Sequence, residues 1–137
     1  MVAAVCTWHE HHAAARAEID ARLNRGERLA VAAPALVETY AVLTRLPPPH
    51  RLAPSDAWQL LDANFAGDDQ IVALSGAAYR RLLRRLAKEG VAGGRTYDAV
   101  MGECARQAGA DAILTFDRRH FDPAPHRVSV VEPGLTR

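Results

Sequence analysis

The sequence is poor in cysteine and in long apolar runs, and each scarcity excludes a class of protein. Cys6 and Cys104 are the only cysteines among 137 residues. They are too few for a disulfide framework, so we expect buried free thiols in a reducing compartment. No stretch approaches the roughly 20 apolar residues of a membrane span. The short apolar run at the N-terminus lacks the basic residues of a signal peptide. We therefore expect a soluble, cytoplasmic protein.

A strong charge of either sign is also absent. The net charge is +1, and Lys88 is the sole lysine among the 17 Lys and Arg residues. No global field therefore draws the chain to nucleic acid, and any such contact needs a local basic patch. Hydrophobic residues make up 49% of the chain and charged residues 24%, an ordinary balance for a globular protein. The length predicts one domain over residues 1–137.

Short apolar runs alternate with helical patterns along the whole chain. This order predicts an α/β domain of three layers, α/β/α, with a mostly parallel central sheet. The runs predict strands over residues 29–33, 70–74, 112–115 and 128–131. The helical patterns cover residues 9–24, 34–46, 56–65, 76–89 and 97–108, with a short helical turn over 117–121.

Several residues predict where these elements begin and end. Ser55 and Ser75 are expected to cap the helices that follow them. A turn is expected over residues 67–69, and the glycine-rich residues 90–94 are expected to break the chain between two helices. The run Val2 to Cys6 first reads as a buried strand.

Three acids follow predicted strands or open the next helix. Glu38 lies one turn into the second long helix, Asp98 in the first turn after the glycine-rich break, and Asp117 directly after Leu114-Thr115-Phe116. Ligands of parallel α/β sheets bind outside the carboxyl ends of the strands. Glu38 and Asp98 also stand in apolar helical surroundings, where an ionised carboxylate needs a cation or hydrogen-bond donors. Mg²⁺ or Mn²⁺ would satisfy such converging oxygens.

Each acid also has an ordinary structural explanation. Glu38 suits a solvated helix position, Asp98 a first-turn acid favoured by the helix dipole, and Asp117 a helix cap. Their shared position near strand ends favours one common site.

Two stretches and the order of elements around them carry a resemblance that covers essentially the whole chain. They are PALVETYAVLTRLP and GGRTYDAVMGECARQAGADAILTFDRRHF. As a set, they resemble a PIN domain, and most closely the VapC-type toxin ribonucleases of bacterial toxin–antitoxin pairs. The resemblance implies an endoribonuclease that depends on Mg²⁺ or Mn²⁺. It also implies a homodimer and a cognate antitoxin protein that covers the acidic groove.

The resemblance also implies roles for individual residues. Asp98 falls on the family's metal-binding aspartate, Asp117 on its late acidic ligand or supporting acid, and Glu38 on the helix glutamate that orients a water. Thr115 falls on the small hydroxyl that lines the site. Arg95 and Arg118 flank the acids and are candidates to contact RNA phosphates.

The beginning of the chain departs from the family pattern. That pattern opens with a strand that ends in an aspartate, and here Met1 already stands past that position. Val2 to Cys6 is then better interpreted as the apolar run after a first strand that this chain lacks, and Glu10 cannot replace the missing acid. With three carboxylates instead of four, a second hypothesis is a PIN domain that binds antitoxin but cleaves RNA poorly.

Other charged or histidine-rich patterns give weaker evidence for a functional site. His9, His11 and His12 lack the i, i+4 spacing of a zinc-binding helix and suit a solvated helix start. His120 and His126 lie near the last acid and could touch RNA, although surface loop positions suit them better. A stripe of basic residues could bind the RNA backbone or could form a solvated helix face. It consists of Arg81, Arg84, Arg85 and Lys88. A phosphoacceptor domain built on Asp68-Asp69 would need a nearby lysine, and Lys88 lies on that stripe.

Overall fold

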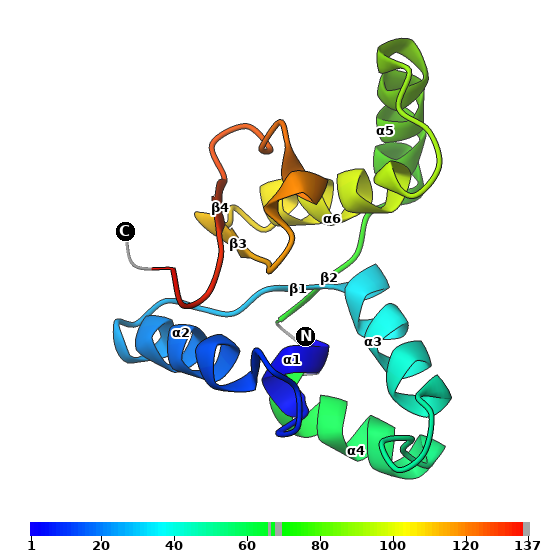
Figure 1. Cartoon of the computed structure of the whole chain (residues 1–137). Coiled ribbons are helices and arrows are strands. Elements are labelled where there is room, and N and C mark those ends of the chain that lie inside the picture. Colours follow the sequence, from blue (N-terminus) through cyan, green and yellow to red (C-terminus); the bar gives the residue numbers. More distant parts are fainter. Residues whose placement is uncertain (66, 68–69, 136–137) are drawn as a thin grey trace. The chain divides into compact units, whose positions relative to one another are not determined.

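The computed structural model of the chain describes residues 1–65, 67 and 70–135 (Figure 1). The chain divides into two compact units. The first comprises Met1–Ile71 with the residues from Pro133 onward, and the second comprises Val72–Glu132. A single domain over residues 1–137 stays a prediction.

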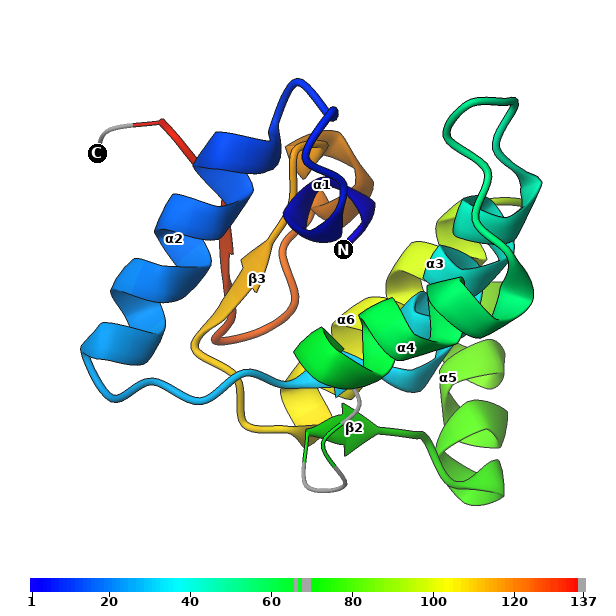
Figure 2. The same ribbon diagram turned by 90° about the horizontal axis from the view of Figure 1, so that it is seen from below.

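The first unit is mainly helical. It contains α1 (Val2–Val5), α2 (His12–Asn24), β1 (Val31–Ala32), α3 (Ala33–Arg45) and α4 (Pro54–Phe65). Helix α1 packs against α2, α3 and α4, while α3 and α4 lie side by side (Figure 2). The backbone N–H of Val31 donates to the carbonyl of Gln70 at 2.8 Å, where β1 pairs with β2 (Ile71–Val72).

The core of this unit follows from helical spacing in α4. Ala57, Leu61 and Phe65 recur every four residues and are buried, and Leu43 of α3 is fully buried as well. Helix α1 buries Ala3 and Ala4. The first interpretation of Val2 to Cys6 as a strand is therefore wrong. A short apolar run has no period that separates strand from helix, and alanine is the strongest helix former.

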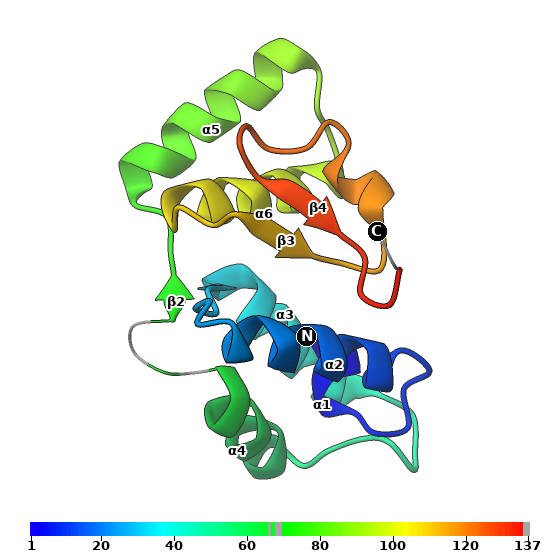
Figure 3. The ribbon, with the colours of Figure 1, turned by 90° about the vertical axis from the view of Figure 1, so that its left-hand side faces the viewer.

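The second unit holds the remaining elements. They are α5 (Gly76–Glu89), α6 (Arg95–Gln107), β3 (Ala112–Leu114), the 3₁₀ helix η1 (Arg118–Phe121) and β4 (Ser129–Val131). Strands β3 and β4 are parallel, with Ala112 opposite Ser129 and Leu114 opposite Val131 (Figure 3). Helix α6 packs against α5, β3 and η1. The unit thus places the start of α6 and the end of β3 near η1.

The α/β class is confirmed, with strands shorter than predicted. The described strands form two two-stranded sheets, β1–β2 and β3–β4. The cap at Ser75 is confirmed, since its Oγ accepts the N–H of Ala78 at 3.2 Å. The cap at Ser55 is wrong, because Pro54 already begins α4 and places Ser55 inside the helix. The expected turn over residues 67–69 lies partly outside the described residues.

Both cysteines are free and buried, as predicted. Burial raises the pKa of the Cys6 and Cys104 thiols, which keeps them protonated. In the part of the chain that the structure describes, no helix is both long enough and apolar enough to traverse a bilayer.

Candidate acidic site

Asp98 and Asp117 come from neighbouring elements of the second unit. Asp98 stands in the first turn of α6, and its side chain is 22% exposed. Asp117 follows β3 and caps η1, where its side chain accepts the N–H of Arg119. Its side chain is 35% exposed. Packing of α6 against η1 places both carboxylates on one side of this unit.

His120 joins the two carboxylates. Its Nδ1 lies 3.5 Å from Oδ1 of Asp98, and its Nε2 lies 3.4 Å from Oδ2 of Asp117. One imidazole ring is therefore contacted on both nitrogens by acids that stand far apart in the sequence. The ring therefore lies between the two carboxylates, at the place where a bound cation would meet both negative charges.

Arg119 makes the tightest contact with Asp117. Its Nε and a terminal nitrogen each donate to a different carboxylate oxygen, both at 3.1 Å. This two-pronged pairing lowers the pKa of Asp117, with His120 adding to the effect. Asp117 is therefore firmly ionised, yet both of its oxygens already have a partner.

The Thr115 side chain fixes the backbone conformation at Asp117. Its hydroxyl accepts the N–H of Asp117 at 3.1 Å and lies 3.4 Å from the carbonyl oxygen of the same residue. A Thr side chain that bonds the backbone two residues on fixes a tight turn. The Thr-x-Asp spacing thus sets the direction in which Asp117 leaves β3.

The two flanking arginines differ in their surroundings. Arg95 begins α6 and donates to the carbonyl oxygen of Asp122 at 2.7 Å, which ties the start of that helix to the residue after η1. Arg118 is the first residue of η1 and is exposed. Arg118 is the freer of the two to meet a ligand.

Glu38 belongs to α3 of the first unit. It is exposed, so the expectation that an apolar environment forces it to find a cation is wrong. Burial lowers the pKa of the Met1 amino group, and the charge of Glu38 partly opposes that shift. The structure brings Asp98 and Asp117 together, and a shared site with Glu38 stays a prediction.

Carboxylate oxygens suit Mg²⁺ and Mn²⁺, so Asp98 and Asp117 are chemically fit to hold either ion. Across residues 1–65, 67 and 70–135, however, no group of three or more His, Cys, Asp or Glu side chains is arranged to hold a metal. His9 and His12 are engaged locally. The Nδ1 of His9 accepts the N–H of His11, and the Nδ1 of His12 lies 2.9 Å from the carbonyl oxygen of Ala3.

Sequence analysis missed the parts played by His120 and Arg119. A signal was present, because His120 stands three residues after Asp117 and Arg119 two residues after it. A separation of three residues places His120 on the same side of the turn as Asp117. The contact of His120 with Asp98 depends on tertiary packing and leaves no local pattern.

A groove of about 460 Å³ in the second unit contains part of this site. Asp98, His120 and Arg95 line it beside His126, and Arg85 and Arg106 line it as well. The groove therefore holds both a carboxylate of the acidic site and several cations.

Comparisons with known proteins identify relatives of this chain. A family model described as "PIN domain" matches residues 1–125. Ribonuclease VapC40 of Mycobacterium tuberculosis (strain CDC 1551 / Oshkosh) is 49% identical over 120 residues, covering 87% of this chain and 82% of that protein. Ribonuclease VapC40 of strain ATCC 25618 / H37Rv matches equally well. Ribonuclease VapC27 of the latter strain is 43% identical over 88 residues, covering 64% of this chain and 61% of its own.

Proposed function

The chain belongs to the PIN domain family, and on that premise we propose that it is an endoribonuclease that depends on Mg²⁺ or Mn²⁺. The proposal includes its role as the toxin of a type II toxin–antitoxin pair. The names of the matched relatives support ribonuclease activity. The observation that carries the proposal is the approach of Asp98 and Asp117 to the two nitrogens of His120.

Asp98 and Asp117 are the residues that would hold the metal ion. Bound there, Mg²⁺ or Mn²⁺ supplies a more acidic water and neutralises charge on the phosphate oxygens. Glu38 is assigned to orient the attacking water, as the family resemblance implies.

The chain's own residues prepare the site before substrate binds. Thr115 holds the backbone of Asp117 in its turn, and Arg119 keeps that carboxylate ionised. His120 contacts both acids through its two ring nitrogens. A cation that binds Asp117 must compete with Arg119, so the affinity for metal depends on how readily this arginine turns away.

Contacts with RNA follow from exposure and charge. Arg118 is exposed beside Asp117 and is proposed to meet a phosphate. Arg95 lines the groove near Asp98 and is proposed to do the same. Thr115 is proposed to line the site beside them. A homodimer, a cognate antitoxin and a cytoplasmic location complete the proposal.

Cleavage of RNA by the purified chain tests this function. We expect products in Mn²⁺ that are absent in EDTA, and the loss of these products with Asp98→Asn. Asp62→Asn is the matched control, since Asp62 is an exposed acid of α4 in the first unit. Equal cleavage by the chain and by Asp98→Asn would refute the site.

The alternative is a PIN domain that binds antitoxin but cleaves RNA poorly. The pairing of both Asp117 oxygens with Arg119 favours it, because this pairing leaves Asp98 as the freer carboxylate. Calorimetric titration with Mn²⁺ separates the two functions. Tight binding that Asp98→Asn abolishes supports the active enzyme, and binding too weak to measure supports the impaired one.

A further inference from the structure

Positive charge in this protein is concentrated on one helix. Helix α5 carries five basic residues and one acid, a net charge of +4, whereas the whole chain has a net charge of +1. The basic residues are Arg80, Arg81, Arg84, Arg85 and Lys88. The rest of the chain is therefore slightly acidic, and α5 is the place where a polyanion would be attracted.

The packing of α5 leaves these cations in solvent. Only Ala78, Leu82 and Leu86 of this helix are buried, a strip one residue wide that recurs every four positions. The helix is closed at both ends, by the Ser75 hydroxyl and by Gly90 in a left-handed conformation with φ of 69°. The cations thus project from a defined scaffold.

Within the described residues, Arg85 is the member of this set that forms ion pairs, while the charge of Arg81 also acts on Glu103. Arg85 contacts Glu89 at 3.6 Å and Glu103 at 3.8 Å. Among the described residues, no acid forms an ion pair with Arg81, Arg84 or Lys88. Like charges three and four residues apart weaken a helix. A bound anion would relieve this repulsion.

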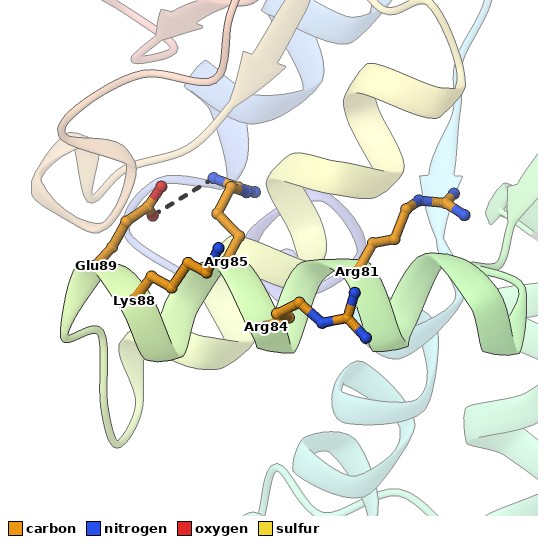
Figure 4. Close-up of a pocket in the computed structure, with 5 residues that line it drawn as sticks. All are labelled: Arg81, Arg84, Arg85, Lys88 and Glu89. Atoms are coloured by element: carbon orange, nitrogen blue, oxygen red, sulfur yellow. Dashed lines mark ion pairs between the residues drawn. The ribbon is translucent and has the colours of Figure 1, made fainter.

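Arg81, Arg84, Arg85 and Lys88 lie at i, i+3, i+4 and i+7 and so share one side of α5 (Figure 4). They line a surface depression of about 280 Å³ together with Glu89. The four span roughly 10 Å along the helix axis, at 1.5 Å per residue. We call these four residues the basic face.

The basic face continues into the groove that contains Asp98. Arg85 and Glu89 line both the depression and the groove. Both hollows lie within the second unit, so their continuity depends only on α5, α6 and the residues around η1. Arg85 therefore joins the basic face to the groove that contains Asp98, and its ion-pair partners Glu89 and Glu103 line the same groove.

We propose that the basic face binds the phosphodiester backbone of RNA on one side of the bond that is cut. This inference rests on the proposed ribonuclease function. RNA is favoured over an acidic protein because the same groove holds the proposed cleavage site. An acidic peptide, such as one from a partner protein, is the competing occupant that the test must exclude.

The test measures binding of a fluorescent single-stranded RNA by anisotropy over a series of salt concentrations. All titrations contain EDTA, so that binding is measured without cleavage. The variant is Arg81→Gln, Arg84→Gln and Lys88→Gln combined. The control combines Arg28→Gln, Arg45→Gln and Arg51→Gln, three exposed arginines of the first unit. Both proteins lose three positive charges.

We expect the basic-face variant to bind RNA at least tenfold more weakly at low salt. The slope of log affinity against log salt should become shallower by about 2, since each phosphate contact with a single strand contributes about 0.7. The control should retain most of its affinity and slope. Equal losses in the two variants would overturn the proposal, as would no loss in the basic-face variant.

Two further measurements keep the outcome decisive. A variant with Arg81→Lys and Arg84→Lys keeps the charge and should keep the slope, and its failure to do so would contradict a backbone contact. Polyglutamate that displaces RNA as well as unlabelled RNA does would assign the face to acidic protein and overturn the proposal. If the chain binds RNA through this face but cleaves none in Mn²⁺, the ribonuclease function fails and the binding face stands.

Discussion

For single residues, the main question is Asp117, where pairing with Arg119 competes with the proposed binding of a metal ion. It caps η1 and pairs with Arg119 through both oxygens, and it is also a proposed metal ligand. A solvent-exposed ion pair of this kind contributes little to stability. The competition is therefore weak enough for a divalent cation to overcome.

Arg119→Ala should increase the affinity for Mn²⁺ by about two- to fivefold, because the ion pair that competes for Asp117 is lost. Isothermal titration calorimetry measures the change. Arg118→Ala removes the same charge from the neighbouring residue and serves as the control. Unchanged affinity in Arg119→Ala would contradict the competition between Arg119 and the metal for Asp117.

Glu103 gives a prediction that depends on pH. Its side chain is only 15% exposed, and hydrogen bonds from Arg106 lower its pKa, with Arg85 and Arg81 adding to the shift. A carboxyl whose pKa is lowered by folding stabilises the protein above its unfolded pKa of about 4.3. That stability disappears as the pH falls through the folded value.

Glu103→Gln should therefore lower the free energy of unfolding by roughly 1 kcal/mol at pH 7 and by much less at pH 3. Urea denaturation at both pH values checks this, with Asp62→Asn as a control of similar charge change. A loss of equal size at pH 7 and pH 3 would show that the ion pair is not responsible.

Among the helices and strands, those whose hydrophobic residues recur with a clear period could be predicted accurately. Helix α5 was predicted to its last residue, because Leu82 and Leu86 stand opposite a continuous row of cations. Val2 to Cys6 was first assigned wrongly, since a run of five apolar residues is compatible with either helix or strand. Ser55 was wrongly expected to cap α4, because the helix already begins at Pro54 and Ser55 lies inside its first turn.

Ser75 and Ser55 offer a matched test of helix capping. Ser75→Ala removes the acceptor for the N–H of Ala78 and should cost about 1 kcal/mol of stability. Ser55→Ala changes a residue inside the first turn of α4 and should leave stability within about 0.5 kcal/mol. Thermal melts followed by circular dichroism compare the two, and a larger loss at Ser55 would contradict the assigned caps.

At the scale of the whole molecule, the α/β class and the PIN resemblance could be predicted because they depend on the order of elements. That Asp98 and Asp117 approach each other could be predicted because each follows a recognisable break in the pattern, and both contact His120; their role in a functional site stays a prediction. The contact of His120 with Asp98 could not be predicted, since it joins residues 22 positions apart through the packing of η1 on α6. The place of Glu38 in the site depends on a different unit and stays a prediction.

The most direct test of the central claim is the rate of RNA cleavage as a function of Mn²⁺ concentration. The chain and Asp98→Asn are measured side by side with RNA in excess over its half-saturating concentration. Our account predicts a rate that rises with Mn²⁺ and saturates for the chain, and a rate about 100-fold lower for the variant. A rate that is independent of Mn²⁺, or the same in both proteins, would contradict it.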